Sequence, residues 1–288
     1  PATSTRLDIA GAVTVTAALM LAVYAIVNGN QAGWTSVQTL GLLGAAAALL
    51  GLFLVIESRV PAPLVPLRLF KHRNISVSNT VGVLWAAAMF AWFFLSALYM
   101  QFVLGYSPLK VGLAFLPANV IMGTFSIGLS AKLVMRFGLR KPLAVGLSFA
   151  AVGMLLFVRA PVDGSFVVDV LPSMILLGIG AGMAFNPVLL AAMGDVEPSE
   201  AGLASGLVNT SFMMGGALGL AVLASIAASR THTLRLAGHD ELSALTGGYH
   251  LAFVFGALFA ALAALLGGLL LRPSEQAVPH GAPAAEAA

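Results

Sequence analysis

The sequence contains no cysteine among its 288 residues, so disulfide bonds, thiolate metal sites and cysteine nucleophiles are excluded. Charge is also scarce, because only 9% of the residues are charged whereas 59% are hydrophobic. The mean hydropathy of +0.98 is higher than a water-soluble domain of this length sustains. These values predict a polytopic membrane protein.

Titratable residues are missing where membrane chemistry would need them. No Asp, Glu, Lys, Arg or His lies near the middle of a long apolar segment, and proton coupling requires such a group within the membrane. The sequence also has no paired carboxylates, no His-Glu helix motif and no activated serine, so we expect neither an enzyme nor a cofactor. The histidines and acidic residues between 232 and 250 have a spacing that fits no metal site.

Long apolar segments make up most of the chain. They are roughly 18 to 25 residues long, enough for a helix to cross about 30 Å of hydrocarbon, and they lack the two-residue alternation of barrel strands. We therefore predict an all-α protein with about eight transmembrane helices. The predicted spans are 9–27, 38–56, 77–101, 110–131, 143–158, 169–192, 202–228 and 249–271.

The basic residues alternate between the two sides of the predicted membrane. One side has Arg6, Arg59, Arg68, Lys71, Arg73, Lys132, Arg136, Arg140, Lys141 and Arg272, whereas the other has Lys110, Arg159, Arg230 and Arg235. By the positive-inside rule, we expect a multi-pass protein of the cell membrane with both termini of this chain in the cytoplasm. Since the basic residues lie at helix ends, they do not indicate nucleic-acid binding.

The connections divide the chain into four predicted parts. Residues 1–60 form two transmembrane helices, and residues 61–76 form a cytoplasmic linker with prolines, an amphipathic stretch and a basic end. Residues 77–271 form a six-helix bundle, with a long external loop from Arg230 to Gly248. Residues 272–288 are rich in Pro and Ala and are predicted to be a disordered cytoplasmic tail.

Large side chains follow one face of the third span. Trp85, Met89, Trp92 and Tyr99 are separated by helical spacings. Such a stripe can line a cavity for bulky apolar or cationic compounds through stacking, cation–π attraction and the adaptable thioether. The alternative is that the stripe faces lipid or fills the protein core.

Three asparagines lie within predicted spans, at Asn119, Asn186 and Asn209. A carboxamide in hydrocarbon needs a hydrogen-bond partner, so each of them either contacts a substrate or bonds to a neighbouring helix. Asn186 precedes Pro187, which predicts a kink and a freed carbonyl in that helix.

Glycines recur at a spacing of four residues on the later spans, which places them on one face of a helix. This pattern is typical of close packing between membrane helices, and it favours packing over direct contact with a ligand. The pairs are Gly178 and Gly182, Gly202 and Gly206, and Gly215 and Gly219.

The segment AKLVMRFGLRKP, from Ala131 to Pro142, resembles the cytoplasmic loop motif of the major facilitator superfamily. Arg136, Gly138, Arg140 and Lys141 match the motif. Met135 stands where the motif has Asp, so the role of that acid is not expected here.

The segment EPSEAGLASGLVNTSFMMGGALGLAVLASIA, from Glu197 to Ala227, resembles the penultimate helix of the fourteen-span drug:proton antiporter branch (EmrB/QacA-like multidrug efflux). Segments near the start of the chain, LDIAGAV, NGNQAGWTS and ESRVPAPLVPLRLFKHRNISVSN, resemble the two central helices of that branch and the entry into its second half. The resemblance covers nearly the whole chain in the correct order.

This resemblance implies that the eight spans are helices seven to fourteen, namely the C-terminal six-helix half and two preceding linker helices. The first six helices, which carry the coupling acids in such transporters, would then be missing from the chain. The implied function is proton-coupled export of hydrophobic or cationic drugs or secondary metabolites by alternating access. The implied partners are small amphipathic or cationic substrates, membrane lipid and the N-terminal six-helix half.

Two other functions stay open from the sequence. One is a metabolite or sugar carrier of the same superfamily, which a charged substrate site within the membrane would favour. The other is a truncated membrane protein that does not transport, because half of a rocking transporter has no opposing wall.

Overall fold

The computed structural model describes residues 8–60, 63–65, 67–193 and 201–272, and within them it contains helices and no strand. The predicted all-α membrane fold is confirmed, since eight helical spans are long and apolar enough to cross a membrane. Six of them are α1 (Ile9–Ala32), α2 (Val37–Arg59), α7 (Arg140–Phe157), α8 (Leu171–Met193), α9 (Ala201–Leu236) and α10 (Glu241–Leu270).

The third and fourth spans are built from several helical segments. The third is α3 (Arg73–Leu98), which continues into a π-helical turn, η2 (Tyr99–Val103). The fourth breaks near Pro117, which cannot supply a backbone N–H to the preceding turn. The segments of the fourth span are α4 (Pro108–Ala114), α5 (Leu116–Thr124), the π-helical η3 (Phe125–Leu129) and α6 (Ser130–Phe137).

The connection between the last two helices is much shorter than predicted. Because α9 continues to Leu236 and α10 begins at Glu241, the prediction of a loop from Arg230 to Gly248 was wrong. Asp240 caps α10 by accepting a hydrogen bond from the Ser243 N–H at 3.0 Å. An ion pair between Arg235 and Glu241 also joins the two helix ends. These local interactions extend both helices past the apolar segments that hydropathy detects.

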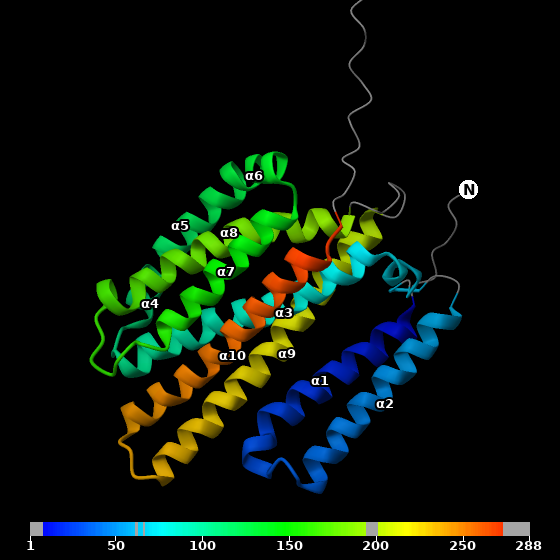
Figure 1. Ribbon diagram of the computed structural model, residues 1–288. Helices are drawn as coiled ribbons and strands as arrows, with labels where there is room; N and C mark the ends of the chain where they lie inside the picture. Colours follow the sequence, from blue (N-terminus) through cyan, green and yellow to red (C-terminus); the bar gives the residue numbers. More distant parts are fainter. Residues whose placement is uncertain (1–7, 61–62, 66, 194–200, 273–288) are drawn as a thin grey trace, which may run out of the picture.

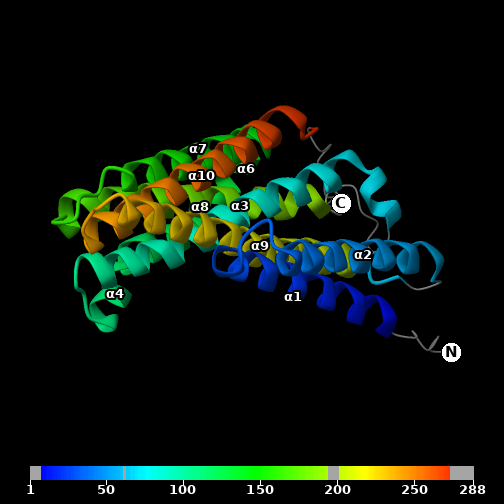
Figure 2. The same cartoon turned by 90° about the horizontal axis from the view of Figure 1, so that it is seen from below.

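Helix α3 belongs to a bundle with the fourth to eighth spans (Figures 1 and 2). Helix α3 packs against α8, α9 and α10, and α7 closes the bundle by packing on both α8 and α10. The fourth span lies against α8 on the outer side of the bundle. The fold therefore places one face of α3, α8 and α9 around a common space.

Helices α1 and α2 form a hairpin beside this bundle. They pack against each other, and α1 also packs along α9 (Figure 1). The connection to the bundle contains a 3-10 turn, η1 (Leu67–Lys71), and an η4 π-turn (Phe166–Val170) precedes α8. Part of the predicted linker, residues 61, 62 and 66, lies outside the described residues, as does the predicted tail from residue 273 onwards.

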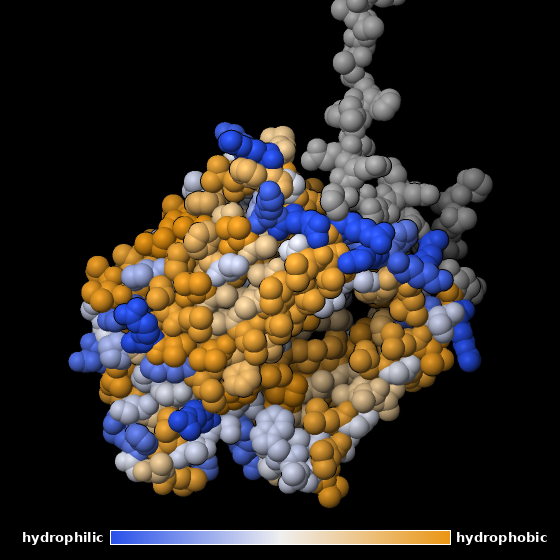
Figure 3. Space-filling model, viewed as in Figure 1, coloured by the Kyte–Doolittle hydropathy of each residue, from blue (hydrophilic) through white to orange (hydrophobic). Residues whose placement is uncertain are grey.

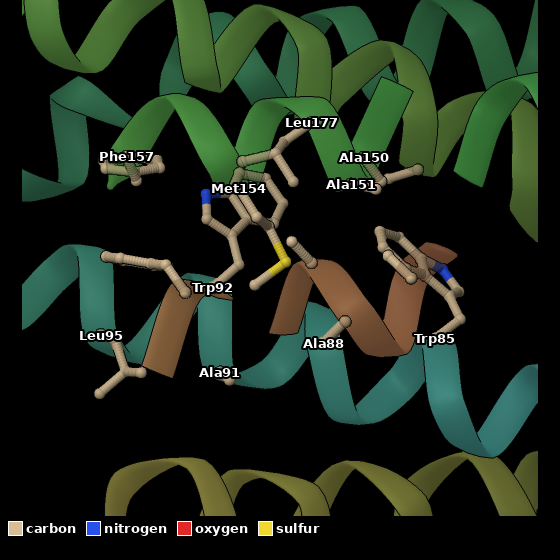
Figure 4. Packing of buried hydrophobic residues seen from close by; sticks show 14 of the residues in the cluster. Trp85, Ala88, Ala91, Trp92, Leu95, Ala150, Ala151, Met154, Phe157 and Leu177 are labelled. Carbon is tan, nitrogen blue, oxygen red and sulfur yellow. The ribbon is translucent and has the colours of Figure 1, made fainter. Parts of the chain in front are cut away.

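The bundle has an apolar core and an apolar outer surface. Figure 4 shows Trp85 and Trp92 of α3 directed towards α7 and its neighbours, close to Ala151 and Met154. Figure 3 shows a broad hydrophobic band along the helices, with hydrophilic side chains gathered at the two ends. This distribution matches a bundle that lies across a bilayer with its ends in water.

Candidate functional site

A cavity of about 280 Å³ lies between α3, α8 and α9, and none of its described lining residues belongs to α7 or α10. None of the described residues that line it is charged, and most of them are apolar. The lining residues are Trp85, Phe185, Val188, Leu189, Ser205, Gly206, Val208, Asn209, Phe212 and Met213.

An aromatic framework supports this cavity. Phe212 of α9 lies edge to face with Phe185 of α8, with their ring centroids 6.0 Å apart. It makes a similar contact with Phe90 of α3 at 6.2 Å. Since edge-to-face pairs have a preferred geometry, Phe212 fixes the three helices relative to one another at the cavity wall.

The cavity face of α9 follows from its sequence. Ser205, Asn209, Phe212 and Met213 are spaced i, i+4, i+7 and i+8, which places them on one side of the helix. Of these four, only Asn209 was singled out as a candidate from the sequence. The other three were missed. Their helical spacing with Asn209 could have placed them on the same face of α9, but spacing does not say which neighbouring helix that face meets.

The predicted aromatic stripe of α3 is divided between different environments. Trp85 is almost fully buried and forms part of the cavity wall. Trp92 has no exposed surface and lies in the core, 4.2 Å from the Phe93 ring, measured between centroids. Tyr99 is buried as well, and its hydroxyl donates a hydrogen bond to the Pro161 carbonyl at 2.6 Å. Trp92 and Tyr99 therefore fill the protein core, which was the alternative to lining a cavity.

Met89 lies apart from this cavity. It is half-buried and lines a second hollow of about 470 Å³ between α3 and α9, together with Phe90, Phe93 and Leu220. The structure thus brings Trp85 and Asn209 to one cavity, whereas it places Met89 at another.

The three asparagines also differ in their surroundings. The Asn186 side-chain amide donates a hydrogen bond to the Ser126 carbonyl at 2.7 Å, which joins α8 to the fourth span. Asn209 is exposed at the cavity wall, and Asn119 is exposed on α5. Asn186 therefore makes the interhelical hydrogen bond that was one of its two alternatives.

Four of the predicted glycines lie at close contacts between helices. A Cβ atom added to Gly178 would lie 2.6 Å from the Ala118 carbonyl oxygen, and one added to Gly182 would lie 2.6 Å from Phe125 Cβ. At Gly215 and Gly219 the obstacles are Val83 Cα at 2.7 Å and Ala87 Cα at 2.5 Å. These distances are too short for any larger residue without movement of the backbone.

Gly202 and Gly206 differ from these four, because an added Cβ would meet no described atom within 4 Å at either position. The close packing expected of them is not found in the described part of the chain. Gly206 instead lines the cavity between α3, α8 and α9.

The loop motif connects two helix ends. Gly138 ends α6 with φ of 74°, in the region that favours glycine. Arg140 donates hydrogen bonds to the carbonyls of Gly268 at 3.1 Å and Leu269 at 2.7 Å, at the C-terminus of α10. Arg136 lies over the Phe137 ring, and Lys141 is exposed. The motif thus places the Arg140 guanidinium at the C-terminus of α10, where the helix dipole is negative and the last carbonyls have no partner within the helix.

We expect Arg140→Gln to lower the free energy of unfolding by about 1 kcal/mol, because the charged hydrogen bonds to these carbonyls are lost. Thermal unfolding of the purified protein in detergent measures this effect. Lys141→Gln is the matched control, since it removes the neighbouring charge from an exposed position. Equal melting temperatures for the two variants would contradict the capping role of Arg140.

The chain is similar in sequence to known proteins. The family model described as Major Facilitator Superfamily matches residues 9–220. The cephamycin export protein CmcT of Amycolatopsis lactamdurans is 35% identical over 229 residues, which are 78% of this chain and 47% of that protein. The puromycin resistance protein pur8 of Streptomyces alboniger is 33% identical over 273 residues, which are 92% of this chain and 54% of that protein.

A third relative, named as the uncharacterized MFS-type transporter EfpA of Mycobacterium tuberculosis, is 33% identical over 302 aligned positions. These positions cover 98% of this chain and 54% of that protein. The chain therefore spans about half the length of the curated relatives that it matches.

Proposed function

The chain belongs to the major facilitator superfamily, and from this premise we propose that it forms the C-terminal part of a transporter that exports hydrophobic or cationic drugs or secondary metabolites. In this proposal the six-span bundle is one half of the transporter, and α1 and α2 are the helices that link it to an N-terminal half. The names of the relatives, which include export and resistance proteins, support the direction of transport.

The observation that carries the proposal is the uncharged lining of the cavity between α3, α8 and α9. Apolar compounds gain contact area there, and the ring of Phe185, which is exposed at the cavity wall, attracts organic cations through its π face. Met213 can adapt its side chain to different shapes. Asn209 and Ser205 supply hydrogen bonds at the same wall. A sugar carrier would need many more polar groups than these.

The opposing wall of the cavity belongs, in this proposal, to six further helices of the complete transporter. The two halves rock about the cavity and expose it first to one side of the membrane and then to the other. The close contacts at Gly178, Gly182, Gly215 and Gly219 suit a half that moves as one body. In this proposal the proton-coupling acid belongs to the other half. The protein lies in the cell membrane, with both ends of this chain in the cytoplasm.

Resistance and efflux assays test this function directly. The complete transporter is expressed in a strain that lacks its own drug pumps, and we expect it to lower the accumulation of a fluorescent cationic dye. A protonophore should abolish the effect if protons drive export. Unchanged dye accumulation and unchanged drug susceptibility, with normal amounts of folded protein in the membrane, would refute the proposal.

We expect Met213→Ala to change resistance several-fold for some compounds and not for others. Met213 is 48% exposed at the cavity wall. How many contacts a substrate loses when this side chain is shortened depends on the shape of the substrate. Minimum inhibitory concentrations for a panel of unrelated compounds measure the effect. Met135→Ala is the matched control, since Met135 is 72% exposed on α6 and lines no part of this cavity. A uniform change across the panel would contradict the role of Met213.

A further inference from the structure

A second groove lies between the α1–α2 hairpin and the bundle, outside the proposed substrate cavity. It has a volume of about 530 Å³ and is formed by α1, α9 and α10. Its lining residues are Ile26, Asn30, Trp34, Val222, Ser225, Ile226, Ser229, Arg230, Thr233, Leu251 and Phe255. No residue described by the structure lines both this groove and the cavity of α3, α8 and α9.

The groove changes in polarity along its length. On α9, Val222 and Ile226 lie on the same helix face as Ser229, Arg230 and Thr233, so the lining becomes polar towards the C-terminus of that helix. On the other side of the groove, Ile26 and Asn30 of α1 and then Trp34 in the turn to α2 show the same change. Both helices therefore place an apolar section inside the membrane and a polar section at one membrane surface.

Hydrogen bonds join α1 to α9 at the level where the apolar section of the groove meets the polar section. The Asn30 side-chain amide of α1 donates to both the carbonyl and the hydroxyl oxygen of Ser225 on α9, each at 2.9 Å. The Trp34 indole N–H donates to the Asn30 side-chain oxygen at 2.9 Å. Because these bonds hold Asn30 and Trp34 in place, the groove has a defined shape at the level where it becomes polar.

Among the described residues that line the groove, Arg230 alone is charged. It is exposed and has no ion pair among the described residues, whereas Arg235 near the same helix end is paired with Glu241. A tryptophan and an arginine at the polar end of an apolar groove match the level of lipid headgroups, where aromatic rings and basic side chains gather.

We propose that this groove binds one anionic phospholipid from the leaflet at the α9–α10 turn. One acyl chain lies along Ile26, Val222, Ile226 and Phe255, and the phosphate group lies against Arg230 with the Ser229 hydroxyl as a hydrogen-bond donor. The Thr233 hydroxyl already donates to the Ser229 carbonyl at 3.0 Å. Charge complementarity favours an anionic headgroup, and the apolar section favours a lipid over free phosphate. The lipid would fill the space between the hairpin and the bundle and stabilise their contact.

Native mass spectrometry of the full chain, released from detergent, tests this proposal. The protein is incubated with phosphatidylglycerol or with phosphatidylcholine of the same acyl chains, and the bound fraction of each is compared. We expect a preference for phosphatidylglycerol that falls about fivefold in Arg230→Gln, the contribution of one basic residue near an anionic headgroup. Arg230→Lys should retain most of the preference, and Arg235→Gln is the matched control on the same helix end.

A second variant tests the apolar section. Ile226→Trp should reduce the binding of both lipids, because the larger side chain occupies the path of the acyl chain, whereas Arg230→Gln should change the preference between them. The proposal is overturned if Arg230→Gln and Arg235→Gln behave alike, if inorganic phosphate displaces the lipid, or if a polypeptide occupies the groove instead. These measurements report binding alone, so their outcome is independent of the proposed transport function.

Discussion

The Gly219→Leu variant is expected to yield no correctly folded protein. A Cβ atom at this position would lie 2.5 Å from the Cα atom of Ala87, which belongs to the backbone of α3 and cannot turn aside as a side chain end could. Helices α3 and α9 would have to separate along their contact, and that contact includes Gly215 against Val83. We expect a loss of more than about 3 kcal/mol, the upper range for overpacked cores.

The amount and dispersity of a fluorescent fusion on size-exclusion chromatography measure this effect. Gly206→Ala is the control on the same helix, because its added methyl group meets no described atom within 4 Å. It should give a single symmetric peak at the wild-type position. A symmetric peak for Gly219→Leu as well would show that α3 and α9 do not pack as closely as described.

The eight spans were predictable because their signal depends on single segments. Apolar length is a property of each segment, and a helix is the form that satisfies the backbone of an isolated segment in lipid. Helix ends outside the lipid follow other rules. At the α9–α10 turn, the Asp240 cap and the Arg235–Glu241 pair extend both helices, and the hydropathy of the sequence carries no information about either interaction.

The candidate site was only partly predictable. The spacing of Trp85, Trp92 and Tyr99 places them on one face of the third span, Trp85 and Trp92 on α3 and Tyr99 at the start of η2, and all three are buried. Periodicity identifies a face, but it does not identify the neighbour that covers it. In the structure, the core covers Trp92 and Tyr99, while α8 and α9 leave a cavity beside Trp85. The same limit applies to Gly206 and Gly219, which have equal chemistry but different neighbours.

The Gly206→Leu variant is expected to fold normally and to lose export of bulky compounds. Gly206 lines the cavity between α3, α8 and α9, and no described atom lies within 4 Å of a Cβ placed there. A leucine side chain can therefore extend into the cavity of about 280 Å³ without displacing a helix. Since the added atoms occupy space that a large substrate needs, we expect export of large compounds to fall on the order of tenfold, equivalent to about 1.4 kcal/mol of lost binding.

Efflux rates for a small and a large compound, each normalised to the amount of folded protein, measure this effect in the complete transporter. Gly206→Ala serves as the control, because a methyl group leaves most of the cavity open. The same leucine substitution thus has two expected outcomes on one helix, since it prevents folding at Gly219 and blocks transport at Gly206. Normal export of the large compound by folded Gly206→Leu would contradict the assignment of this cavity to substrate, and it would leave the packing of α9 against α3 unaffected.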